Sequence, residues 1–309
     1  MLFDYDKHGN LDTVIDVYGR EIDFEFTLQS DGVKRLTKIT DFMGREVKYV
    51  YDSNGDLVEV TRPAVTGTST GNNFPNGKTE EYTYSSGFED EKLNHNMLSF
   101  TAPNEVAADG PPKLSWTYGN DSNEPMKYDR VLTETEGGTN VSGVAAGGTL
   151  SFEYAMLNEN EPLGQPDLPR GRAIVTDRNG NVKHYFVNEY QLHIKTLEFT
   201  KELRDGEPDS FETLTYHDAD GQVIRRVEPE GNETQFVYDS SGDRRSQGNL
   251  LQQIRVADID RGGGADLVTT YEYEPLYNQL RRMTDPRGND AGFVPPLGDQ
   301  SAERSTKTF

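Results

Sequence analysis

A short acidic–glycine phrase recurs along this chain and constrains its fold more than any other feature. Between residues 214 and 243 it occurs three times, as Asp218–Gly221, Glu228–Gly231 and Asp239–Gly242. The acidic side chain that opens each phrase can accept a nearby backbone N–H, and glycine adopts a positive φ at little cost. The segments between the phrases are rich in Val, Ile, Thr, Phe and Tyr. The stretch therefore predicts short β-strands joined by tight turns.

The same phrase occurs throughout the chain, and Arg, Asn, Asp or Gln follows its glycine. The other copies are Asp6–Gly9, Asp16–Gly19, Asp41–Gly44, Asp52–Gly55, Asp177–Gly180 and Asp285–Gly288. A second signal is a pair of aromatic residues two positions apart. The pairs are Phe3/Tyr5, Phe24/Phe26, Tyr49/Tyr51, Tyr82/Tyr84, Trp116/Tyr118, Phe152/Tyr154, Phe236/Tyr238 and Tyr271/Tyr273. Residues i and i+2 of a strand share one face, so the pairs predict an aromatic ladder that crosses many strands of one sheet.

The pattern predicts an all-β protein with very little helix. Alternation within the expected strands is weak, since Val223, Arg225 and Val227 would share one face and Ile224 lies among polar residues on the other. The core of a β-sandwich requires cleaner alternation. Two partly polar faces favour a curved, single-layer sheet, wet on both sides and built by stacking hairpins.

The spacing of the repeats divides the chain into four parts. Residues 1–62 and 173–289 carry tight repeats. Residues 63–172 carry repeats stretched by insertions, and residues 290–309 form a tail without a strand pattern. Within the insertions, 64–78, 102–112 and 158–170 are expected to be loops rich in Gly, Pro or polar residues, and 87–98 could form a short helix.

Composition excludes several classes of partner. The net charge of −22 disfavours nucleic acid and anionic membranes, and leaves calcium or a basic partner open. The chain has no cysteine, which excludes disulfides and thiol chemistry and is compatible with a bacterial exported protein. No apolar run has the length of a membrane span, and the first ten residues have no signal-peptide pattern.

Three phrases of the chain resemble the YD repeats of rearrangement hotspot (Rhs) proteins, a family grouped with teneurins and the shell-forming subunits of Tc toxins. These phrases begin at Asp41, Tyr49 and Phe236, and 269–289 also resembles one bacterial Rhs repeat. The resemblance covers 1–62 and 173–289 well and the middle only loosely. It implies a long β-ribbon that coils into a hollow shell, is secreted or exposed at a cell surface, and encloses or displays a toxin.

The resemblance also implies which partners to expect. They are the remaining segments of an Rhs shell or a second shell subunit, an enclosed toxin, and a glycan or protein receptor. The chain opens within a repeat and ends soon after Asp285–Gly288, without the closing core domain of the family. We therefore expect one segment of a larger wall. Some family members cleave themselves near an Asp-Pro-x-Gly motif, which Asp285–Gly288 matches, but an ordinary repeat turn matches those letters equally well.

Calcium is the one metal for which the sequence offers a candidate site. Asp258, Asp260 and Asp266 stand at positions one, three and nine of a loop, a spacing at which oxygen ligands can surround calcium. Position five is Gly262, where a third ligand would be needed. Capping of turns is the commoner role for such aspartates, as it is for Asp52–Asp56 and Asp218–Gly221.

The remaining chemistry predicts no catalysis and no cofactor. The five histidines have no metal-ligand spacing, no nucleophile elbow is present, and Gly262–Gly264 is not followed by the Lys of a phosphate-binding loop. The leading hypothesis is a structural, non-enzymatic wall segment. The alternative is a surface adhesin or carbohydrate-binding repeat module that contacts its ligand through the insertions at 64–78 and 85–112. A self-cleaving fragment is the third hypothesis.

Overall fold

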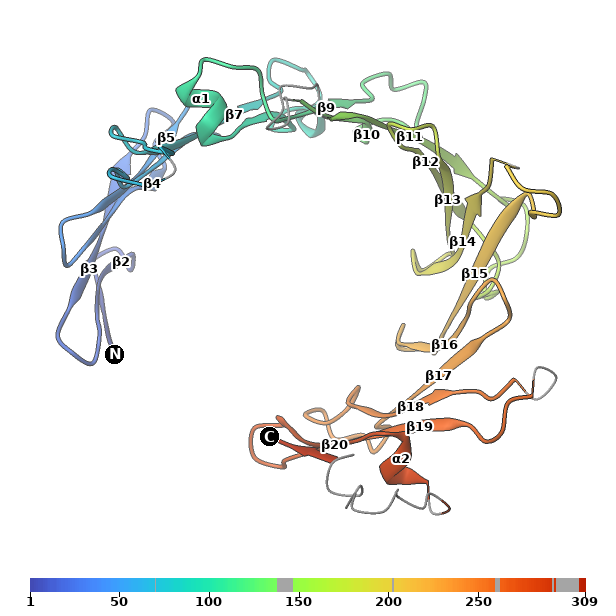
Figure 1. Ribbon diagram of the computed structural model, residues 1–309. Coiled ribbons are helices and arrows are strands. Elements are labelled where there is room, and N and C mark those ends of the chain that lie inside the picture. The colour runs from blue at the N-terminus through green and yellow to red at the C-terminus, as the bar shows by residue number, and fades with distance from the viewer. Residues whose placement is uncertain (70, 138–146, 202, 259–261, 291, 293–305) are drawn as a thin grey trace. The chain divides into compact units, whose positions relative to one another are not determined.

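The structure of the protein is a computed structural model. The structure describes residues 1–69, 71–137, 147–201, 203–258, 262–290, 292 and 306–309. These residues divide into two compact units, the first comprising Met1–Glu153 with Asp177–Asn179 and the second Tyr154–Thr176 with Gly180–Phe309. Each unit is an antiparallel sheet in which a strand pairs with its neighbours in sequence (Figure 1). The predicted all-β class is confirmed.

The first unit holds β1 to β10 and most of β11, together with two short helical turns. Their bounds are β1 Leu2–Tyr5, β2 Leu11–Ile15, β3 Glu21–Leu28, β4 Lys34–Asp41, β5 Glu46–Tyr51, β6 Leu57–Arg62, β7 Lys78–Tyr84, η1 Glu91–Leu93, β8 Met97–Thr101, α1 Pro103–Ala107, β9 Leu114–Tyr118, β10 Val131–Glu136 and β11 Gly148–Met156. The second unit holds the rest. Its elements are β12 Gly171–Thr176, β13 Val182–Val187, β14 His193–Phe199, β15 Ser210–His217, β16 Val223–Val227, β17 Glu233–Tyr238, β18 Leu250–Arg255, β19 Leu267–Tyr273, β20 Leu280–Thr284, α2 Pro286–Asn289 and β21 Thr306–Thr308.

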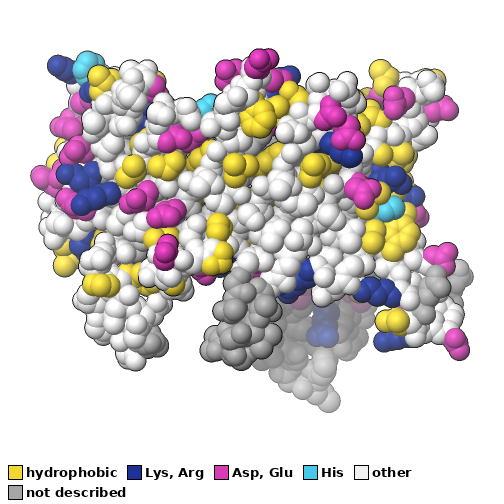
Figure 2. Space-filling model, turned by 90° about the horizontal axis from the view of Figure 1, so that it is seen from above, with side chains coloured by type: hydrophobic (Ala, Val, Ile, Leu, Met, Phe, Trp, Pro, Cys, Tyr) yellow, Lys and Arg dark blue, Asp and Glu magenta, His cyan; other side chains and the backbone are white. Residues whose placement is uncertain are grey.

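Very little apolar surface is fully enclosed in either sheet. Among the described residues, the buried hydrophobic side chains are Val60, Phe74, Leu93, Phe186 and Ile194. Figure 2 shows hydrophobic side chains interspersed with acidic and basic ones on the face that it draws. A sheet covered by a second layer would bury a continuous apolar face. The single-layer sheet expected from the weak alternation is therefore what the chain forms.

Apart from Asp285–Gly288, the predicted acidic–glycine turns are present, and their geometry explains each position of the phrase. In Asp52–Asp56, the Asp52 Oδ1 atom accepts from the backbone N–H of Asn54 and Asp56, each at 2.9 Å. Gly55 lies at φ +89°, a conformation that L-residues rarely adopt. The residue after the glycine completes the turn where it is basic, because the Nε atom of Arg45 donates to Asp41 Oδ2 at 2.7 Å.

These hydrogen bonds make the stability of the turns depend on pH. Bonds from the Asn10 side chain and backbone lower the pKa of Asp6 to about 2, and bonds from the residue after the glycine lower the pKa values of Asp16 and Asp41. A depressed carboxyl pKa stabilises the fold above the unfolded-state value, and this stability is lost as pH falls through the folded value. We therefore expect the melting temperature to fall between about pH 4 and pH 2. Asp6→Asn should remove part of this pH dependence, since its amide oxygen can accept the same two backbone N–H groups, those of His8 and Asn10, without titrating. An unchanged pH dependence of the melting temperature would contradict this expectation.

Four segments differ from what the sequence predicted. The expected helix in 87–98 is only the three-residue turn η1, capped by Asp90, and the expected loop 102–112 contains α1. Asp285–Gly288 opens α2 with Asp285 as N-cap instead of forming the positive-φ turn. In the tail, expected to lack strands, β21 pairs with β20.

Candidate functional site

The aromatic pairs lie on odd-numbered strands, where one face carries both rings. Tyr49 is paired in register with Val60 and Phe24 with Ile39. Across the sheet, most aromatic residues of one odd-numbered strand are thus separated from those of the next by an aliphatic residue of the even-numbered strand. Among the described residues, one predicted pair member stacks on an aromatic ring of the next strand, Tyr82 on Phe100 at 5.5 Å. The ladder therefore alternates aromatic and aliphatic rungs instead of stacking ring on ring.

The second tyrosine of a pair has a specific role at the junction between an even-numbered strand and the odd-numbered strand that follows it. At each such junction discussed below, the pairing of the two strands stops three residues or more before the odd-numbered strand ends. We call the residue three places after the last paired residue of the odd-numbered strand the junction position. Tyr51 occupies it at the β4–β5 junction, where the last pair is Lys38 with Lys48. Its hydroxyl donates to the backbone carbonyl of Leu36 at 3.0 Å and so bridges the two strands.

The same hydrogen bond recurs at three other junctions. The hydroxyls of Tyr118, Tyr238 and Tyr273 donate to the carbonyls of Met97, Val223 and Leu250 at 3.0, 2.9 and 3.2 Å. In each case the acceptor lies two residues before the last paired residue of the even-numbered strand. Register shifts occur immediately before Tyr51, Tyr238 and Tyr273 on their other edge, and such bulges redirect a side chain.

Removing one junction hydroxyl should have a measurable cost. Tyr238 is partly buried, and burial raises the pKa of its hydroxyl. We expect Tyr238→Phe to lower the free energy of unfolding by about 1 kcal/mol, the net value of one such hydrogen bond. Tyr277→Phe is the matched control, because Tyr277 lies in a loop of the same unit and is 74% exposed. Chemical denaturation of both variants tests this; equal losses would contradict a role for the junction hydroxyl.

In the described part of the chain, two junction positions hold a residue other than tyrosine, and a larger cavity accompanies each of them. Phe26 occupies the β2–β3 junction and His217 the β14–β15 junction. The cavities beside them measure about 520 Å³ each. Cavities of about 340 and 360 Å³ lie beside Tyr273 and Tyr238.

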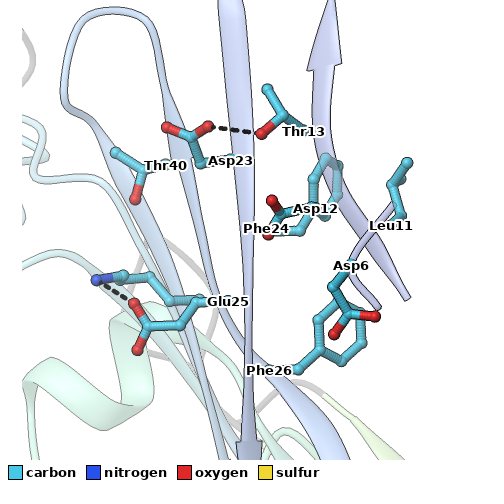
Figure 3. A pocket seen from close by; sticks show the side chains of 10 residues that line it. Asp6, Leu11, Asp12, Thr13, Asp23, Phe24, Glu25, Phe26 and Thr40 are labelled. Carbon is cyan, nitrogen blue, oxygen red and sulfur yellow. Dashed lines mark hydrogen bonds and ion pairs between the residues drawn. The ribbon is translucent and has the colours of Figure 1, made fainter. Parts of the chain in front are cut away.

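The cavity at Phe26 is a slot between β3 and the hairpin of β1 and β2, wholly within the first unit (Figure 3). A hydrogen bond of 3.2 Å from Thr13 Oγ1 to Asp23 Oδ1 closes one end of it. Its lining combines two aromatic rings with four carboxylates and one lysine; the residues are Asp6, Leu11, Asp12, Thr13, Asp23, Phe24, Glu25, Phe26, Lys38 and Thr40. The slot is therefore negatively charged with an apolar wall.

The cavity at His217 lies in the second unit, between the turns Asn188–Leu192 and Asp218–Gly221 and Pro166 of the long insertion. Burial lowers the pKa of His217, so this side chain favours the neutral form. Its Nδ1 atom is buried without a hydrogen-bond partner in the described part of the chain.

The sequence-predicted calcium loop is only partly described. Asp260 lies outside the described residues. Asp266 Oδ1 accepts the backbone N–H of Ala257 at 2.8 Å, and the carbonyl of Asp258 accepts that of Gly263 at 2.7 Å. Among the described residues, no group of three or more His, Asp or Glu side chains is arranged to hold a metal. Calcium binding by Asp258, Asp260 and Asp266 stays a prediction.

The insertions that the binding-module hypothesis singled out are partly ordered by contacts within themselves. Phe74 of 64–78 is buried and bridges to Val65 through two backbone hydrogen bonds. In 85–112, Leu93 is buried and the Ser85 hydroxyl donates to the Leu93 carbonyl at 2.6 Å. Their apolar residues therefore hold the loops in place.

Among the described residues, no helix has the length and apolar character that a membrane span requires.

Comparison with known proteins gives low-level structural matches. No family model and no curated protein matches the chain. Among solved structures, it is similar to a TcdB2-TccC3-Cdc42 crystal structure (14% identity, TM-score 0.36) and to TcdB2-TccC3 without its hypervariable C-terminal region (13%, 0.36). A Tc holotoxin pore of Photorhabdus luminescens matches at 13% identity and a TM-score of 0.34. Each match covers 91% of this chain and 16% of the other, so the chain spans less than a fifth of these proteins.

Proposed function

We propose that the chain is a non-catalytic wall segment of an Rhs-type β-shell, which encloses or displays a cargo such as a toxin domain and is exported as part of a larger protein. The observation that carries the proposal is the recurrence of one hairpin design. Capped turns such as Asp16–Arg20 and Asp52–Asp56 alternate with junctions bridged by a tyrosine hydroxyl. Such a design extends a sheet by repetition and needs no central core.

The YD phrases support the Rhs assignment because the tyrosine and the aspartate of the phrase each have a structural role. In Phe236–Gly242, Tyr238 bridges back to Val223 and Asp239 accepts the backbone N–H of Ser241. The tyrosine joins one hairpin to the preceding one, and the aspartate turns the chain into the next strand. In this way each hairpin pairs with the exposed edge strand of the hairpin before it. Paired edge strands protect a long sheet from unspecific association with other chains. Containment follows if such a wall curves around its contents.

The proposal is tested on the natural polypeptide that carries this chain. Cryo-electron microscopy should show a curved wall one sheet thick, with these repeats as part of it. Limited proteolysis should leave any enclosed cargo intact until the wall is opened by denaturant. A compact two-domain particle, or a cargo digested as fast as an isolated domain, would overturn the proposal. Intact mass after prolonged incubation should remain unchanged, since the proposal assigns no self-cleavage to Asp285.

A further inference from the structure

We propose that the slot at the β2–β3 junction binds a cationic group on an apolar stem, an ammonium or guanidinium, in the position that a tyrosine hydroxyl fills at other junctions. The starting point is Phe26. By register it stands where Tyr51, Tyr118, Tyr238 and Tyr273 stand at their junctions, because the last β2–β3 pair is Thr13 with Asp23. Phenylalanine has no hydroxyl to donate. This inference does not depend on the shell function.

The acceptor that loses its donor can be named. At the four bridged junctions the accepting carbonyl lies two residues before the last paired residue of the even-numbered strand. Counting two residues back from Thr13 gives Leu11, which lines the slot together with Phe26. By register, the Leu11 carbonyl therefore stands where the other junctions place the acceptor of a tyrosine hydroxyl.

The side chains around the slot select a positive charge for that donor. Asp6, Asp12 and Asp23 line it, and Glu25 is paired with Lys38 at 2.8 Å. Four carboxylates and one lysine leave the lining negative. Asp6 remains ionised to low pH because hydrogen bonds from Asn10 lower its pKa, and Lys34 Nζ lies 3.9 Å from its Oδ2 atom. An anionic or uncharged ligand would leave the charges of Asp12 and Asp23 uncompensated, whereas a cation interacts with them favourably.

The walls favour an apolar stem with the charge at its end. Phe24 and Phe26 contribute aromatic surface on β3, and Leu11 contributes aliphatic surface from the hairpin (Figure 3). Aromatic faces attract ammonium and guanidinium groups and pack against methylene chains. A cavity of about 520 Å³ accommodates such a group. Lysine and arginine side chains and aliphatic polyamines share this chemistry.

The test measures binding of two probes to the full chain by calorimetry at fixed ionic strength. One probe is cadaverine, a free diamine, and the other is an oligolysine peptide with blocked ends. We expect saturable binding at one site for at least one probe. Binding of cadaverine would identify small amines as sufficient, and binding of the peptide alone would identify a protein side chain. Absence of saturation with both probes at millimolar concentration overturns the proposal.

Two variants and two controls locate the site. Phe26→Tyr supplies the missing hydroxyl and should weaken binding about tenfold or more while preserving or raising the melting temperature. Asp12→Asn removes charge without altering the aromatic wall and should also weaken binding. Tyr51→Phe, at the next junction, and Asp220→Asn, which removes an exposed charge in the second unit, should bind as the parent does. Equal weakening by Asp220→Asn, or full binding by both Phe26→Tyr and Asp12→Asn, overturns the proposal.

Discussion

Asn188→Ala is expected to lower the free energy of unfolding of the second unit by about 3 kcal/mol, the largest loss we predict for a single side chain. Asn188 is fully buried. Its Oδ1 atom accepts the backbone N–H groups of Tyr190 and Leu192, each at 3.0 Å, and its Nδ2 atom donates to the Pro166 carbonyl at 2.8 Å. Alanine would leave all three backbone groups without this partner, and a buried unpaired group costs more than a lost hydrogen bond.

The neighbouring contacts make the effect spread along the insertion. Glu189 Oε1 accepts the backbone N–H groups of Gly164 and Gln165 at 2.7 and 3.1 Å, and Arg170 donates to the carbonyls of Asn158 and Pro162. Hydrogen bonds from Asn188 and Glu189 thus hold residues 158–170 on the 188–192 turn. Hydrogen–deuterium exchange should show faster exchange in both segments of the variant.

Asn188→Asp separates the two functions of this side chain. A carboxylate keeps the turn cap, as Asp52 does in its own turn, but it cannot donate to the Pro166 carbonyl. We expect a loss between those of the parent and Asn188→Ala, with faster exchange confined to 158–170. If both variants unfold at the denaturant concentration of the parent, Asn188 has no structural role of this kind.

Gly77→Ala is expected to cost about 3 kcal/mol, because two independent penalties coincide at this residue. Gly77 lies at φ +103°, and a Cβ atom built there would be 2.6 Å from the Arg62 carbonyl oxygen. The obstructing atom belongs to the backbone of β6, which pairs with β7 directly beside the glycine through Arg62 and Lys78. Relief would require the two strands to shift.

Gly67→Ala is the matched control in the same loop. Gly67 also has a positive φ, +71°, but no atom of the described residues lies within 4 Å of its added Cβ. Its cost should be about 1 kcal/mol, that of the backbone conformation alone. Thermal or denaturant unfolding of the two variants measures the difference. Equal costs would show that the contact with Arg62 relaxes freely.

Much of the local structure was predictable because it depends on neighbouring residues. The Asp52–Asp56 turn is made by hydrogen bonds that span two and four residues, so its letters are sufficient to recognise it. The Asn188 turn has the same cap, but it has Gln191 at φ +61° where the phrase has glycine. Sequence reasoning missed it because neither the acidic residue nor the glycine is present. The one available signal was the strand-like His184–Val187 run before it.

The candidate slot at the β2–β3 junction could not be predicted from the sequence. Phe24/Phe26 was read as one aromatic pair among eight, and in sequence Phe26 looks equivalent to Tyr51. The absence of a hydroxyl at Phe26 has a consequence only because the strand register places Leu11, 15 residues earlier in the chain, at the acceptor position. The hydrogen bonds at the bridged junctions join residues 15 to 23 positions apart. Pairing at such distances depends on bulges and on strand register, which cannot be read from the local sequence.

The amino-acid sequence by itself determined the class of this protein, its hairpin repeats and the cap of nearly every acidic turn, since these follow from short-range backbone preferences. Only the tertiary structure decided which tyrosines bridge neighbouring hairpins, where the bridge is absent and which insertion is held by Asn188. Those features depend on the alignment of separate strands, and a single-layer sheet with few buried side chains fixes that alignment through hydrogen bonds between distant residues.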